Sequence, residues 1–169
     1  MNENFRFKDL PYVRPDFAKV KTELAAITEK MKNAASYEEA KAAYFDFESI
    51  MSDLRDAYTI VSIRHTVDTR DKFYDDENEF LSEAFPELSP YTVAFSNALY
   101  DGKFKADFEK EFGKQLLSMI ELERKSFSEK NIPLQQKEAK LCNEYEKIIA
   151  SAEIDFDGEK RNLYGVMKY

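Results

Sequence analysis

One uninterrupted helical pattern dominates the sequence and constrains the shape of any fold that contains it. Residues of one face recur in alternating steps of four and three, as α-helical periodicity requires: Ala40, Tyr44, Phe47, Met51, Leu54, Tyr58, Val61, His65 and Asp68. A helix over 37–69 is roughly 50 Å long at a rise of 1.5 Å per residue. A compact domain of this chain length is only ~40 Å across. The pattern therefore predicts an elongated molecule.

Shorter helical patterns lie on both sides of this long helix, separated by proline, glycine and capping signals. Ser36 followed by Glu39 forms a capping box at the start of the long helix. The first helix carries a regular apolar face: Phe17, Val20, Leu24, Ile27 and Met31. We predict helices near 16–33, 37–69, 71–85, 90–100, 104–112, 114–128 and 134–151. The predicted fold class is all-α, an elongated antiparallel helical bundle with long helices.

The period changes near the C-terminus. The residues of 152–156 alternate between apolar and acidic side chains, as in a β-strand. Asp157-Gly158 is a strong signal for a two-residue turn between antiparallel strands. A small C-terminal β-hairpin is therefore predicted near 152–163.

Composition narrows the classes of partner and compartment. The formal net charge is -8, which argues against nucleic acid, because phosphate binding needs clustered Lys and Arg. The sequence lacks an apolar run long enough for a membrane span, and Met1–Leu10 does not resemble an export signal. The single cysteine, Cys142, does not require an oxidising compartment, and we expect it to be a buried small apolar residue. These features predict one cytoplasmic domain over 1–169.

The residue types for metal or nucleophilic catalysis are missing. The chain has one histidine, His65, and contains neither HExxH nor Cys-x-x-Cys. Because His65 falls on the inner face of the long helix, we interpret it as structural. The acidic run Asp71–Glu77 lacks the glycine of a calcium loop and is expected to be a solvated face. We therefore predict no catalytic, cofactor-binding or metal-binding residue in this chain.

Several collinear segments resemble the N-terminal helical region of oligoendopeptidase F-like proteins, which belong to the thimet-oligopeptidase family of zinc metallopeptidases. The segments are Tyr12–Asp16, Thr69–Tyr74 leading into Glu77–Glu79, Phe112–Leu116, and Ile149–Ala152 running into Ile154–Glu159. Their order and spacing match over nearly the whole chain, although none of them is a catalytic motif.

The resemblance implies that the chain is truncated from a longer peptidase whose HExxH zinc motif lies downstream. Zinc is thus expected in the parent enzyme but not in this chain. The chain is expected to form one wall of the peptide-binding cleft and to restrict entry to short peptides. Its partners would be the downstream catalytic domain of the same polypeptide and oligopeptide substrates. Tyr12, Arg14 and Asp16 are interpreted as a device that starts the first helix.

An alternative interpretation is a free-standing helical module that presents its long apolar face to a partner helix. Truncation would also leave apolar surface bare, so we expect the isolated chain to form a homodimer. Its contact face is expected on the final helix and hairpin or on the long helix, where Met51, Leu54, Tyr58 and Val61 are the candidate residues.

Overall fold

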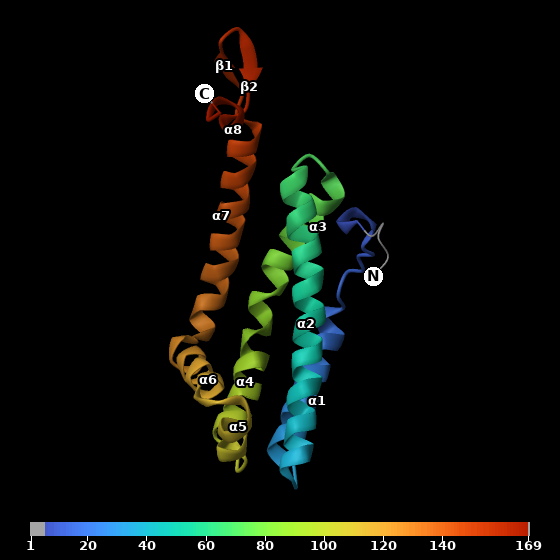
Figure 1. Ribbon diagram of the computed structural model, residues 1–169, viewed down its shortest axis with the longest axis vertical. Helices are drawn as coiled ribbons and strands as arrows, with labels where there is room; N and C mark the ends of the chain where they lie inside the picture. The colour runs from blue at the N-terminus through green and yellow to red at the C-terminus, as the bar shows by residue number, and fades with distance from the viewer. Residues whose placement is uncertain (1–5, 169) are drawn as a thin grey trace.

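The long helix predicted from the sequence is α2 (Tyr37–Val67), and it runs along much of the molecule's length (Figure 1). The structure is a computed structural model that describes residues 6–168. Met1–Phe5 and Tyr169 belong to the predicted domain 1–169 but lie outside the described residues. The all-α class, the elongated bundle and the C-terminal hairpin are confirmed.

The remaining elements follow one another along the chain with short connections. The α-helices are α1 (Phe17–Asn33), α3 (Lys72–Ala84), α4 (Ser89–Tyr100), α5 (Lys105–Phe112), α6 (Lys114–Ser126), α7 (Ile132–Ser151) and α8 (Leu163–Val166). Three short 3-10 helices are η1 (Phe7–Asp9), η2 (Pro86–Leu88) and η3 (Glu129–Asn131). The strands are β1 (Ile154–Phe156) and β2 (Glu159–Arg161). Within residues 6–168, none of the helices combines the length and apolar character needed to cross a membrane.

Side-chain caps fix the starts of the first two helices. Asp16 Oδ1 accepts a hydrogen bond of 3.0 Å from the backbone N–H of Lys19 at the start of α1. Ser36 Oγ accepts one of 3.3 Å from the backbone N–H of Glu39 at the start of α2. Glu39 Oε2 in turn accepts a hydrogen bond of 2.7 Å from the backbone N–H of Ala35. This donor is one residue before the position that a standard capping box uses. The predicted capping pair therefore forms, with a shifted return bond.

The core lies where α1, α2, α3, α4 and α6 meet. Helix α1 packs against α2 and α4, α2 packs against α3, and α4 packs against α6. All five apolar residues predicted for the face of α1 are buried: Phe17, Val20, Leu24, Ile27 and Met31. The rings of Phe47 in α2 and Phe95 in α4 stack in parallel, with centroids 4.0 Å apart. The contacts of α4 with α1 and α2 join helices that are far apart in the sequence.

The apolar stripe of α2 is covered mostly by the chain itself. Leu54 and Val61 are buried, so the expectation that they belong to a bare dimer face is wrong. The reason is that α1 and α3 pack against α2 and remove this stripe from water. Tyr58 remains 43% exposed and is the most accessible of the four candidate residues.

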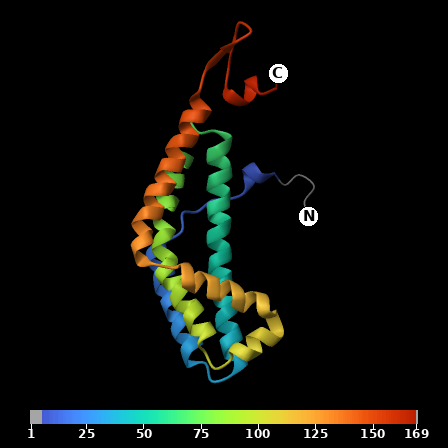
Figure 2. The same cartoon turned by 90° about the vertical axis from the view of Figure 1, so that its left-hand side faces the viewer.

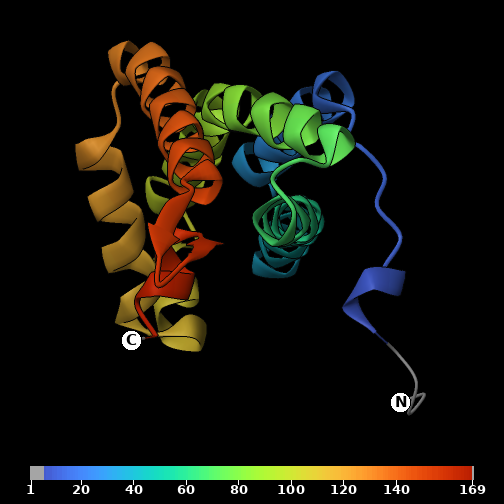
Figure 3. The ribbon, with the colours of Figure 1, turned by 90° about the horizontal axis from the view of Figure 1, so that it is seen from above.

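Helix α7 lies along α3 and stands away from α2, as the view from above shows (Figure 3). Every residue of α7 is at least partly exposed. Its apolar residues Leu134, Leu141, Tyr145 and Ile148 are exposed. Cys142 is exposed as well, so the prediction that it is buried is wrong. A helix with a neighbour on only one side cannot bury a full turn of side chains.

The C-terminal hairpin projects beyond the end of α7 (Figure 2). Ile154 pairs with Arg161, and Phe156 pairs with Glu159 in an antiparallel register. The turn residues Asp157 and Gly158 have φ angles of 54° and 79°. Positive φ at both central positions is the requirement of a type I′ turn, which the Asp-Gly pair predicts.

Candidate functional site

A buried carboxylate anchors the N-terminal segment to α3. Glu77 is only 3% exposed, although it belongs to the acidic run that was expected to be a solvated face. Tyr12 donates a hydrogen bond of 2.6 Å to Glu77 Oε2, and Arg14 Nε lies 3.0 Å from both carboxylate oxygens. Arg14 also donates from its terminal nitrogen to Glu77. The expectation of a solvated face is therefore wrong at Glu77, because this carboxylate has a cation and a hydroxyl as partners.

The electrostatics of this anchor follow from those contacts. Hydrogen bonds from Arg14 lower the pKa of Glu77, and they outweigh burial, which acts in the opposite direction. Burial and the hydrogen bond to Glu77 raise the pKa of Tyr12 above its ordinary value. Tyr12, Arg14 and Asp16 thus hold the chain in place ahead of α1: two of them bind α3, and the third caps the helix.

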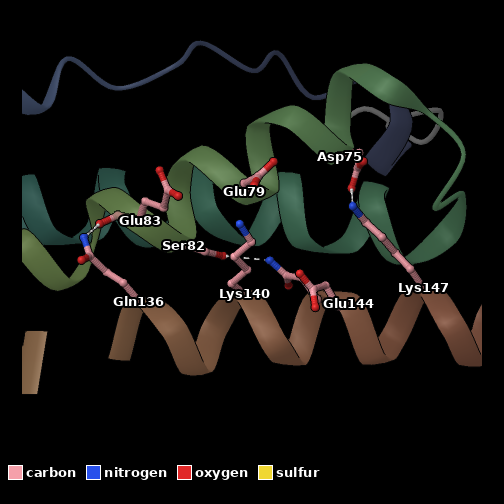
Figure 4. Close-up of a pocket in the computed structure, with 9 residues that line it drawn as sticks. Asp75, Glu79, Ser82, Glu83, Gln136, Lys140, Glu144 and Lys147 are labelled. Atoms are coloured by element: carbon pink, nitrogen blue, oxygen red, sulfur yellow. Dashed lines mark hydrogen bonds and ion pairs between the residues drawn. The ribbon is translucent and has the colours of Figure 1, made fainter. Parts of the chain in front are cut away.

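A small polar cavity of about 90 Å³ separates α3 from α7 (Figure 4). Gln136 donates a 2.7 Å hydrogen bond to the backbone carbonyl of Glu83, and Asn143 donates one of 3.3 Å to Ser82 Oγ. Asn78 donates to Asn143 Oδ1 at 3.1 Å. The close-up shows the side chains of α7 directed at α3 across this cavity. Polar contacts therefore make up much of the junction between the two helices.

His65 lies at the edge of this junction and is buried. Its Nε2 atom is 3.2 Å from Asp75 Oδ1, and Lys147 Nζ lies 2.6 Å from the same oxygen. Burial alone would raise the pKa of Asp75, but Lys147 and His65 outweigh burial and hold it below its ordinary value. His65 thus links α2 to Asp75 of α3, which agrees with a structural role, and the same carboxylate contacts Lys147 of α7.

The described residues do not fit a zinc ion. A catalytic zinc needs about three His, Cys or carboxylate ligands that converge on one point. Residues 6–168 contain no group of three such side chains placed to hold a metal. His65 and Asp75 supply only two, and the Lys147 ammonium lies against the Asp75 oxygen that faces His65.

An apolar hollow with a polar wall lies between α2, α4 and α6. It has a volume of about 400 Å³. Its lining residues are Tyr44, Phe47, Glu48, Met51 and Arg55 of α2, Thr92, Phe95, Ser96 and Leu99 of α4, and Leu116, Met119, Ile120 and Glu123 of α6. We call this hollow the α2/α4/α6 groove. Its volume lies in the range of small-ligand and peptide-binding sites.

One carboxylate in this groove is held by neutral groups. Ser96 donates a 2.8 Å hydrogen bond to Glu123 Oε2, and the Thr92 hydroxyl lies 3.4 Å from Oε1. Across the groove, Arg55 lies 3.5 Å from Glu48 Oε2. The groove therefore combines aromatic and aliphatic walls with an oriented carboxylate.

The described chain is thus a helical domain with an uncovered terminal helix and an apolar groove. Residues 7–127 match the Peptidase M3 N-terminal domain, so the chain belongs to this peptidase family. No curated protein is similar enough to count as a match.

Three solved structures share the fold over almost the whole chain. A protein described as an oligoendopeptidase F is 31% identical, with a TM-score of 0.94, over 98% of this chain and 29% of that chain. An oligoendopeptidase F from Bacillus anthracis is 34% identical, with a TM-score of 0.92, over 96% of this chain and 30% of that one. PZ peptidase A, solved with an inhibitor, is 32% identical, with a TM-score of 0.93, over 97% and 29%. The chain thus spans less than a third of the length of these relatives.

The sequence patterns place Tyr44, Phe47 and Met51 of the groove only on the apolar face of the long helix, and they do not single out Glu123 or the polar residues of the junction. Glu77 and Asp75 differ from their acidic neighbours only in which α-helical face they occupy and in what packs there. The spacing of Leu116, Ile120 and Glu123 is a signal that could have been used, because it places a carboxylate on the same helical face as two apolar residues.

Proposed function

We propose that this chain is the non-catalytic N-terminal domain of a zinc oligoendopeptidase, and that its helices form one wall of the peptide-binding cleft. The observation that carries the proposal is the match itself, which covers 96–98% of this chain but only 29–30% of each peptidase. The lack of fit between the described residues and zinc supports a metal site elsewhere in the parent enzyme. The wall would limit access to short peptides.

The exposed face of α7 supports a partner in the same polypeptide. Its apolar residues have no cover within the described chain: Leu134, Leu141, Tyr145 and Ile148. We assign this face to the downstream catalytic domain, because apolar surface of this kind is stabilised by burial against another domain. We also propose a cytoplasmic location, in line with a single cysteine, and cell fractionation would test it.

The test compares residues 1–169 with the longest product of the same reading frame. We expect the longer product to cleave short fluorogenic peptides in the presence of zinc and to cleave long unfolded chains poorly, and residues 1–169 alone to cleave neither. In the longer product, Met119→Trp adds bulk at the rim of the groove and should raise KM for the longer peptides. Val67→Trp, at an exposed site outside the groove, serves as the matched control.

Two results would contradict the proposal. A reading frame that stops at Tyr169 would favour the alternative, a free-standing helical protein-interaction module. Equal cleavage of short peptides and long chains would remove the role in limiting access.

In the isolated chain a second copy could cover the same face. We propose a homodimer formed through α7, and light scattering over a concentration series would detect it. Replacing Leu141 and Ile148 together by Lys should give a monomer with an unchanged helical content. A strict monomer for the unaltered chain at high concentration would contradict the dimer.

A further inference from the structure

We propose that the α2/α4/α6 groove binds the free N-terminal residue of a short peptide. The α-ammonium group would pair with Glu123, and a bulky apolar first side chain would fill the groove. The inference rests on the proposed function only in taking a peptide as the ligand.

The groove has a polar end and an apolar end. Helices α2 and α4 run in opposite directions (Figure 1), and the Phe47–Phe95 stack fixes how they are aligned. Arg55 follows Phe47 in α2, and Thr92 precedes Phe95 in α4. The two residues therefore lie toward the same end of the groove, where the Thr92 hydroxyl contacts Glu123. At the other end, Tyr44 and Leu99 leave the lining apolar. A ligand with a charged group beside an apolar one would be oriented by this difference.

The charges of the groove leave one carboxylate without a cation. Two carboxylates, Glu48 and Glu123, and one guanidinium, Arg55, line it, while the lining residues from α4 are uncharged. Arg55 is paired with Glu48. In the part of the chain that the structure describes, the hydrogen-bonding partners of Glu123 are hydroxyls of α4. Hydrogen bonds that join two charged groups are about twice as strong as neutral ones, so a ligand ammonium would gain most at this carboxylate.

The position of Glu123 favours an α-ammonium over the ammonium of a lysine side chain. Met119 and Ile120 are four and three residues before Glu123, so all three side chains share one face of α6. The carboxylate therefore lies beside the apolar surface rather than beyond it. In an N-terminal residue the ammonium and the apolar side chain are attached to the same carbon, whereas lysine carries its ammonium at the end of a four-carbon stem. A volume of about 400 Å³ accommodates one large side chain and the first peptide unit.

The experiment measures binding of three peptides to the unaltered chain by NMR, read at the methyl groups of Met119 and Ile120. The peptides are Phe-Ala-Ala-amide, its N-acetylated form, and acetyl-Lys-Ala-Ala-amide. We expect the free phenylalanine peptide to bind about tenfold more tightly than its acetylated form, the ratio that corresponds to one charge-assisted hydrogen bond. Equal binding of these two peptides, no binding, or tightest binding of the lysine peptide would each overturn the proposal.

Two variants assign the effect to one side chain. Glu123→Gln keeps the shape and the hydrogen-bond acceptor but removes the charge, so it should abolish the preference for the free N-terminus. Glu121→Gln is the matched control, because Glu121 lies on the same helix, is half-exposed and pairs with Lys125. The control should keep the tenfold preference, and an equal loss in both variants would overturn the assignment. Since this readout is binding by residues 1–169, it can fail while the longer product still cleaves peptides, and the reverse also holds.

Discussion

Helices α1 and α7 have similar sequence patterns and opposite surroundings. Both carry apolar residues at helical spacing, and for both the bounds predicted from the sequence are close to the observed ones. Yet α1 buries its whole apolar face between α2 and α4, while every residue of α7 is at least partly exposed. Periodicity thus reveals which face of a helix needs cover. It does not reveal whether the same chain supplies that cover.

The two helices are also attached by different forces. The contacts of α1 are largely apolar and are stabilised in proportion to the area that they remove from water. Those of α7 are largely polar, such as Lys147 with Asp75 and Asn143 with Asn78. A typical intramolecular hydrogen bond contributes only about 1 kcal/mol net, because water competes for both partners. The attachment of α7 should therefore be much weaker than that of α1.

The largest expected difference concerns truncation of apolar side chains in the two regions. Phe95→Ala in the bundle should lower the free energy of unfolding by about 3–5 kcal/mol, because Phe95 is buried and stacked on Phe47. Leu141→Ala in α7 is its matched partner and should change stability by less than about 0.5 kcal/mol, since Leu141 is 54% exposed. Urea unfolding followed by circular dichroism measures both. Similar losses in the two variants would remove the contrast between the helices.

A smaller effect is expected at the anchor between the N-terminal segment and α3. Glu77→Gln should cost about 2 kcal/mol at neutral pH, since it removes a charged partner from Arg14 inside a buried contact. Glu79→Gln, on the exposed side of the same helix, should be nearly neutral. The same unfolding measurement distinguishes them.

The anchor also has a predictable pH dependence. The pKa of Glu77 is lowered from its ordinary value of 4.5, so the folded state binds this proton less readily than the unfolded state. The contribution of Glu77 to the free energy of unfolding is therefore complete at pH values above that ordinary pKa. It is lost as the pH falls through the lower, folded-state pKa. The unaltered chain should lose stability in acid more steeply than Glu77→Gln. Parallel curves for the two proteins would show that the ion pair is not responsible.

The smallest effect is expected at the junction of α3 and α7. Asp75→Asn weakens the contacts with Lys147 and His65, and we expect less than about 1 kcal/mol of global destabilisation, because water reaches the partly exposed Lys147 and screens its charge. Hydrogen exchange should nevertheless become faster throughout α7 and stay unchanged in α1. Asp76→Asn, which breaks an exposed pair with Lys72, is the control. Faster exchange in α1 as well would mean that α7 and the bundle open together.

Local signals predict much of the fold and little of the site. The capping residue Ser36 and the turn pair Asp157-Gly158 act over a few residues, so their effects can be read from the sequence. The partners of Glu77 are more than sixty residues away in the chain, and those of Glu123 lie on another helix. Such contacts depend on how helices are placed side by side. Cys142 was misjudged for the same reason, because its burial depends on neighbours that α7 lacks.

The isolation of α7 has a mechanical consequence. The helix has 20 residues and is thus roughly 30 Å long. It is joined to α6 through Phe127, Ser128 and η3, and the backbone of Phe127 and Ser128 is extended rather than helical. A rotation of only about 10° at that connection would swing the far end, with its hairpin, through about 5 Å. A small angular change near α6 would therefore move the hairpin by more than the width of a side chain.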